Sequence, residues 1–68
     1  MEVITEFTVL KVGNRIYAPK LNKDFKLVGY SYSQIFKDML AHLEPEDKNE
    51  KGFQITLSNL MALEYEVY

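Results

Sequence analysis

Hydrophobic and polar residues alternate along most of this chain, and this alternation is typical of half-buried β-strands. The first run is rich in β-branched residues and has apolar side chains on both faces, so we expect it to be partly covered on each side. Gly13-Asn14 predicts a two-residue hairpin turn after it, and Pro19 ends the next strand because proline has no N–H for a ladder. The expected strands are residues 3–12, 15–17, 24–28, 53–57 and 63–68.

One segment, residues 31–44, has a helical pattern. Ser31 is the expected N-cap with Gln34 as its capping-box partner, Ser33 is an alternative start, and Pro45 ends the helix. The apolar stripe, in which we expect Phe36 and Leu40 to be core residues, comprises Ile35, Phe36, Met39, Leu40 and Leu43.

Residues 58–63 allow two interpretations, a helical turn capped by Ser58 or a bulge that leads into the last strand. The pattern predicts a single domain over residues 1–68 of the α+β class. Its sheet is small and mostly antiparallel, with the element order β-β-β-α-β-β and one helix packed on one face. One helix does not cover five strands, so we expect a second subunit on the far face.

The length of 68 residues also favours self-association, because a chain this short buries a small core. It has no cysteine for disulfides and one histidine, His42, so we expect a homo-oligomer without metal or cofactor. The acidic start, residues 1–6, is unlike a signal peptide, and no apolar run is long enough for a membrane span. We therefore expect a cytoplasmic protein.

The expected chemistry is binding, because no catalytic constellation is present. His42 would be the only histidine available as a base, and we interpret it as a dispensable residue near the helix end. The isolated glycines form no phosphate-binding motif. The remaining carboxylates fall in a charged loop, residues 44–52, or on an exposed strand face at Glu64 and Glu66. We therefore predict no enzymatic activity.

Charge is distributed unevenly although the net charge is only -2. Residues 11–30 carry five cations against Asp24 alone, whereas residues 38–68 carry seven carboxylates against two lysines. Arginine holds phosphate and tyrosine stacks on bases, so an anionic nucleotide is the expected ligand. The alternative is that these tyrosines are half-buried and the lysines only keep the surface solvated. The candidate ligand-binding residues are Arg15, Tyr17, Lys20, Lys26, Tyr30 and Tyr32, with Arg15 and Tyr17 on one strand face.

Tyr30-Ser31-Tyr32, the run from Phe36 to Leu40 and the run from Phe53 to Leu57 resemble the YonK-type small proteins of phages and prophages over about half of the chain. The resemblance implies a phage-encoded, multimeric protein, and small phage proteins of this kind include sponges for the nucleotide messengers of host immunity. The leading hypothesis is such a sponge. The alternative is a protein–protein interaction module that inhibits a host protein through the acidic loop and the Glu64–Glu66 edge. We do not expect nucleic-acid binding, because the chain is net acidic.

Overall fold

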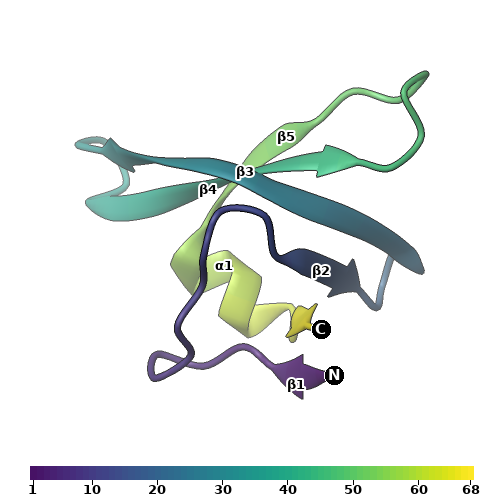
Figure 1. Ribbon diagram of the computed structural model, residues 1–68. Coiled ribbons are helices and arrows are strands. Elements are labelled where there is room, and N and C mark those ends of the chain that lie inside the picture. The colour runs from purple at the N-terminus through teal and green to yellow at the C-terminus, as the bar shows by residue number, and fades with distance from the viewer.

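The computed structural model describes residues 1–68 and contains one antiparallel sheet of six strands in the order β1-β6-β2-β3-β4-β5 (Figure 1). A single short helix, α1, connects β5 to β6. The elements are β1 (Glu2–Val3), β2 (Arg15–Ala18), β3 (Lys23–Ser33), β4 (Asp38–Pro45), β5 (Phe53–Thr56), α1 (Leu57–Ala62) and β6 (Glu66–Val67).

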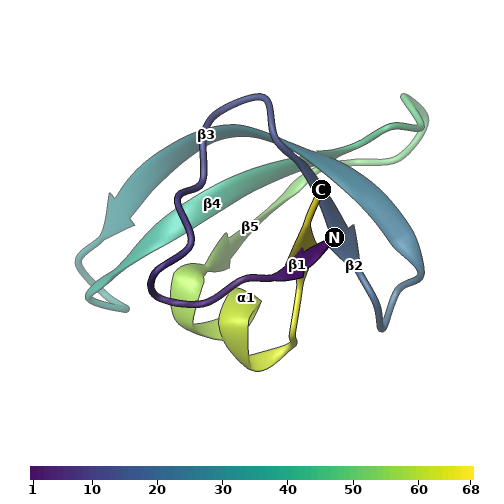
Figure 2. The ribbon, with the colours of Figure 1, turned by 60° about the horizontal axis from the view of Figure 1, so that its bottom comes forward.

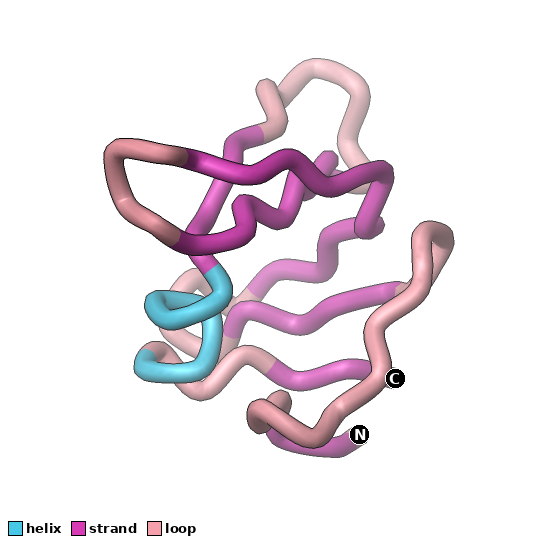
Figure 3. The backbone as a smooth tube through the Cα atoms, turned by 90° about the vertical axis from the view of Figure 1, so that its left-hand side faces the viewer, coloured by secondary structure: helices cyan, strands magenta, loops and turns pink.

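The sheet bends strongly, and α1 lies on the inner side of the bend with the N-terminal segment, residues 4–14 (Figure 2). The long strand β3 pairs with β2 through Lys23–Lys26 and with β4 along most of its length, with a bulge between Leu27 and Gly29. The outermost pairs of β3 and β4 have no further strand beside them, because β2 and β5 end before this point. We call residues 29–42 the hairpin arm: its outermost pairs extend beyond the other strands, whereas Leu40–His42 also pair with β5. The turn of this arm lies on the same side as α1 (Figure 3).

The core fills the inside of the bend and gathers residues from both ends and from the middle of the chain. Ile16, Leu27, Leu43 and Leu60 are its largest fully buried side chains. Alternation explains the strand faces: in β2, Ile16 and Ala18 are buried, whereas the residues between and before them are not. The predicted fold class, a small antiparallel α+β domain with one helix, is confirmed.

The predicted position of the helix is wrong. Residues 31–44 form the end of β3, a turn and most of β4, so the helix follows the fifth strand instead of the third. Phe36, predicted to be a core residue, is 67% exposed in that turn, and Leu40 is only partly buried. The apolar residues of β4 alternate instead, with Ala41 and Leu43 in the core. Pairing with both β3 and β5 outweighed the local helical spacing.

The true helix begins one residue before the expected turn. Thr56 is its N-cap, and its hydroxyl accepts a hydrogen bond from the N–H of Asn59 at 3.1 Å. Ser58 instead donates to the carboxylate of Asp38. The helical-turn interpretation of residues 58–63 is therefore correct, but the predicted cap is wrong.

The predicted first strand and hairpin are also wrong. Only Glu2–Val3 is a strand, and it pairs with β6 instead of β2. Asn14 does close a turn, donating its N–H to the carbonyl of Lys11 at 3.0 Å, and Gly13 has a φ of 103° there. This turn leads out of an irregular segment. β6 in turn lies between β1 and β2, so the Glu64–Glu66 segment is not the sheet edge that we expected.

Candidate functional site

The candidate ligand residues fall into two separate groups. Arg15 and Tyr17 share one face of β2, as predicted, and this is the outer face. Tyr30 and Tyr32 lie opposite Ala41 and Met39 of β4, on the inner face of the hairpin arm. The structure therefore does not bring the two pairs of residues together within one chain.

The guanidinium of Arg15 is already surrounded by groups of its own chain. It forms ion pairs with Asp24 at 3.1 Å and with Glu46 at 3.0 Å, and it stacks over the ring of Tyr68 at 4.6 Å. The Tyr68 hydroxyl donates to Asp24, and this hydrogen bond raises the pKa of Tyr68. A phosphate at Arg15 would have to compete with two carboxylates.

The other predicted basic residues are open to solvent. Lys20 is exposed in the turn after β2, and Lys26 is exposed opposite Arg15 on β3. Tyr17 donates its hydroxyl to Asn22 at 2.7 Å. A surface hollow of about 470 Å³ borders this region, and its walls mix three cations with two carboxylates: Gly13, Arg15, Lys26, Glu44, Pro45, Glu46 and Lys48.

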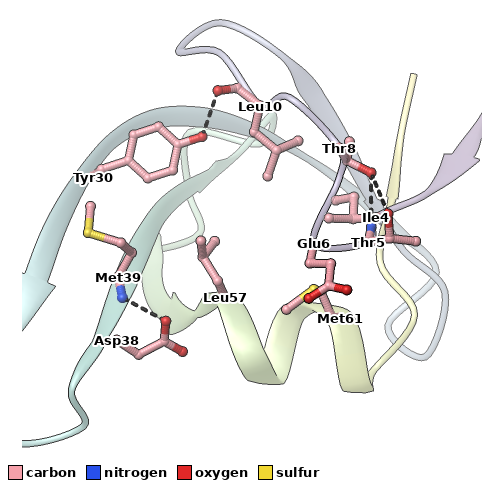
Figure 4. A pocket seen from close by; sticks show the side chains of 10 residues that line it. All are labelled: Ile4, Thr5, Glu6, Thr8, Leu10, Tyr30, Asp38, Met39, Leu57 and Met61. Carbon is pink, nitrogen blue, oxygen red and sulfur yellow. Dashed lines mark hydrogen bonds between the residues drawn. The ribbon is translucent and has the colours of Figure 1, made fainter.

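A second hollow, the apolar pocket, lies between the N-terminal segment, the hairpin arm and α1 (Figure 4). Its volume is about 390 Å³, and six of its ten lining residues are hydrophobic. The lining residues are Ile4, Thr5, Glu6, Thr8, Leu10, Tyr30, Asp38, Met39, Leu57 and Met61.

Two sets of hydrogen bonds hold the wall made by the N-terminal segment. The Tyr30 hydroxyl donates to the carbonyl of Leu10 at 3.0 Å, so the ring spans from the arm to this segment (Figure 4). Burial raises the pKa of Tyr30 above its ordinary value. Thr5 and Thr8 close a turn, because the N–H of Thr5 donates to the Thr8 hydroxyl at 2.9 Å. This wall therefore has a defined shape although it contains no regular strand.

The charged groups of the apolar pocket are both acidic. Asp38 accepts hydrogen bonds from Ser58 and from the N–H of Met39 at 2.8 Å, and the bonds from Ser58 hold the pKa of this carboxyl below its ordinary value. Glu6 forms no ion pair. The pocket thus combines an apolar wall with negative charge and no lining cation.

Large hydrophobic side chains are exposed on two segments that contribute to the pocket, the N-terminal segment and the hairpin arm with its turn. Single exposed hydrophobic residues are common on protein surfaces, but a group of large ones beside an apolar hollow is typical of an interaction surface. The apolar collar comprises Phe7 (86% exposed), Val9 (77%), Tyr32 (60%), Ile35 (90%) and Phe36 (67%).

The remaining candidate for chemistry is His42. His42 lies in β4, not near a helix end as predicted, and its Nε2 is 2.8 Å from the Ser31 hydroxyl. No charged group orients the other ring nitrogen through a hydrogen bond. No group of three or more acidic or histidine side chains is placed to hold a metal ion, and no helix has the length and apolar character needed to cross a membrane.

Sequence reasoning identified Tyr30 and Tyr32 but not the pocket around Tyr30. The pocket unites residues as distant as Ile4 and Met61, and no local pattern signals such a meeting. No protein-family model matches the chain, and the comparisons with curated proteins and with solved structures also found no match.

Proposed function

We propose that the protein is a non-enzymatic protein–protein interaction module that binds an apolar side chain of its partner in the pocket beside α1. The observation that carries this proposal is a mainly apolar pocket of about 390 Å³, two of whose contributing segments also carry the exposed side chains of the apolar collar. Concave apolar sites with few polar groups are common binding sites. Large aromatic and aliphatic side chains that fill such pockets supply most of the binding energy of many interfaces.

A protein partner fits this surface better than a small ligand does. A small molecule in the pocket would leave side chains such as Phe7 and Ile35 in water, at 86% and 90% exposure. A protein segment that enters the pocket would cover these side chains as well. Removal of this apolar surface from water stabilises a complex by about 25 cal/mol per Å² before the entropic cost of association.

The test is selection of peptides of about 12 residues from a random display library on the immobilised full chain, with binding then measured by calorimetry. We expect selected peptides to share a large apolar residue and to lose at least roughly tenfold in affinity for Met39→Asp, which places a charge in the pocket wall. Leu21→Ser is the matched control, because Leu21 is 52% exposed and lies in the turn at the other end of β3. Peptides that bind Met39→Asp as well as the parent would contradict the proposal.

Sequestration of an anionic nucleotide is the second candidate function. Its support is the hollow of about 470 Å³ that Arg15, Lys26 and Lys48 border. Its weakness is that Arg15 already pairs with Asp24 and Glu46. Calorimetry with cyclic dinucleotides is the direct test. Binding that weakens in Arg15→Ala and not in Met39→Asp would favour this function over the interaction module.

Phage origin, a role in host immunity and a cytoplasmic location remain hypotheses. They follow from the resemblance and from composition, and the proposed pocket does not depend on them.

A further inference from the structure

The tip of the hairpin arm, residues 35–37, carries apolar and cationic side chains that complement the apolar pocket. Ile35 and Phe36 are 90% and 67% exposed at the turn between β3 and β4. The next residue, Lys37, is exposed and forms no ion pair within the chain. The tip therefore presents two large apolar side chains and one free cation.

The apolar pocket complements the tip in hydrophobicity and has the opposite charge. Its walls are mainly apolar, its charged groups are the carboxylates of Glu6 and Asp38, and no cation lines it. Glu6 is exposed and has no partner in its own chain. Resting on the proposed function, we propose that the partner is a second copy of this chain, whose Phe36 enters the apolar pocket while its Lys37 meets the acidic rim.

The placement of tip and pocket on one arm suits a closed dimer. Tyr30 lies in the pocket wall and β3 ends at Ser33, which is roughly 10 Å further along the strand. A two-fold axis that runs between the tip and the pocket would bring each tip to the pocket of the other copy. Such an interface uses the same surface on both copies and closes after two chains, so it does not form filaments.

The other side chains of the apolar collar, Phe7, Val9 and Tyr32, supply area beyond the tip itself. A stable interface commonly buries about 800 Å² on each partner. That is about one sixth of the 4831 Å² surface of this chain, more than one phenylalanine covers. Tyr32 lies opposite Met39 of the pocket wall, and Phe7 and Val9 belong to the N-terminal segment that forms the facing wall. These side chains would extend the contact between the two arms.

The first experiment measures the mass of the full chain by analytical ultracentrifugation over a range of concentrations. We expect a monomer–dimer equilibrium for the parent. Phe36→Ser should weaken dimerisation roughly tenfold or more, the scale for the loss of an aromatic anchor. Because Phe36 is exposed within one chain, this change should leave the monomer fold intact, as circular dichroism would verify. Leu21→Ser, at the opposite end of β3, is the control that should dimerise like the parent.

A mixing experiment tests whether the contact is reciprocal. Phe36→Ser retains the pocket and lacks the tip, whereas Met39→Lys retains the tip and carries a charge in the pocket wall. Each variant alone should be largely monomeric. An equal mixture should form a heterodimer through one intact tip and one intact pocket. If the mixture dimerises no better than either variant alone, the reciprocal arrangement is wrong.

Charge reversal and salt test the contact between Lys37 and the acidic rim of the pocket. Lys37→Glu should weaken dimerisation, and the parent dimer should weaken as salt rises because Lys37 faces carboxylates near solvent. Lys37 has a φ of 51°, and a non-glycine replacement keeps the strain of that turn similar. Lys20→Glu, in the turn between β2 and β3, is the matched charge reversal that should leave dimerisation unchanged. Equal effects of both reversals would exclude a specific role of Lys37.

The outcomes separate this inference from the proposed function. A parent that is monomeric while display peptides still bind in a Met39-dependent way would overturn the dimer and keep the interaction module. A dimer that is insensitive to Phe36→Ser would also overturn this interface. A monomer that binds no apolar peptide would overturn both.

Discussion

The carboxylate of Asp38 accepts two hydrogen bonds from Ser58, one from the backbone N–H at 3.0 Å and one from the hydroxyl at 2.8 Å. This contact joins the first residue of β4 to the first turn of α1. It lies at the rim of the apolar pocket, whose walls include Met39, which follows Asp38, and Leu57, which precedes Ser58. The same side chain therefore connects the position of the helix to the shape of the pocket.

The stability that this contact supplies should depend on pH. The hydrogen bonds from Ser58 lower the pKa of Asp38 below its ordinary value of 3.8. A group with a lowered folded pKa stabilises the fold above the unfolded pKa and loses this contribution as pH falls through the folded value. Asp38→Asn should thus be less stable than the parent at neutral pH, and the difference should shrink below pH 3.8. Urea unfolding across this pH range measures both free energies.

Ser58→Ala is the matched variant for this pH dependence, because it removes the hydroxyl donor and leaves the carboxylate. Ser58→Ala should be less stable than the parent at neutral pH, and it should unfold in acid at a higher pH than the parent does. A parent and an Asp38→Asn protein that unfold at the same urea concentration at neutral pH would contradict the stabilising role of the contact.

Truncation of Leu60 should destabilise the domain strongly, unlike truncation of Phe36. Leu60 is fully buried in the core, so Leu60→Ala should cost about 2–5 kcal/mol in unfolding free energy. Phe36→Ala should change the monomer by less than about 0.5 kcal/mol, because Phe36 is 67% exposed. Denaturation at a concentration where the chain is monomeric separates this effect from dimerisation. Equal losses for both variants would mean that Phe36 packs within its own chain.

The strands that the sequence predicted well are those that local pattern defines. Ile16 and Ala18 alternate with polar residues before Pro19, and Phe53–Thr56 alternates after a charged loop, so both strands could be located without the rest of the chain. The predicted α+β class is correct, although the helix on which that prediction rested, residues 31–44, is in the wrong place. Arg15 and Tyr17 also share one strand face, as predicted.

The predicted helix around Phe36 was wrong because the apolar spacing of this segment fits a helix as well as a hairpin. Ile35 and Phe36 complete the helical stripe only if they are buried, and the structure places both at an exposed turn. The pairing of Tyr30 with Ala41 decides the outcome, and this is a contact between residues that local periodicity does not relate. The apolar pocket escaped prediction for the same reason, since its walls come from both ends of the chain.

His42 should be dispensable for binding but should contribute to stability through Ser31. The two side chains meet at 2.8 Å across β3 and β4, outside the apolar pocket. His42→Ala and Ser31→Ala should each cost on the order of 1 kcal/mol, the net value of one hydrogen bond. The double variant should cost less than the sum, because both single changes remove the same bond. Loss of peptide binding in a folded His42→Ala protein would instead place His42 in the function.

Replacement of Gly52 should reveal how closely the loop before β5 approaches β4. A Cβ at Gly52 would lie 2.5 Å from the carbonyl oxygen of Leu43 and 3.3 Å from Cγ of Glu44. The Leu43 oxygen belongs to the backbone of β4, next to the pairing of Leu43 with Phe53, so it does not move freely. Gly52→Ala should therefore destabilise the domain by about 1–3 kcal/mol, the usual cost of overpacking.

Gly29→Ala is the matched control, because its Cβ would meet only Nδ1 of His42 at 4.0 Å. That ordinary contact, together with the reduced freedom of the unfolded chain, should leave Gly29→Ala as stable as the parent or more stable by about 0.4–1 kcal/mol. Thermal and urea unfolding of the two variants compare them directly, and a Gly52→Ala protein as stable as Gly29→Ala would show that the loop can move away from β4.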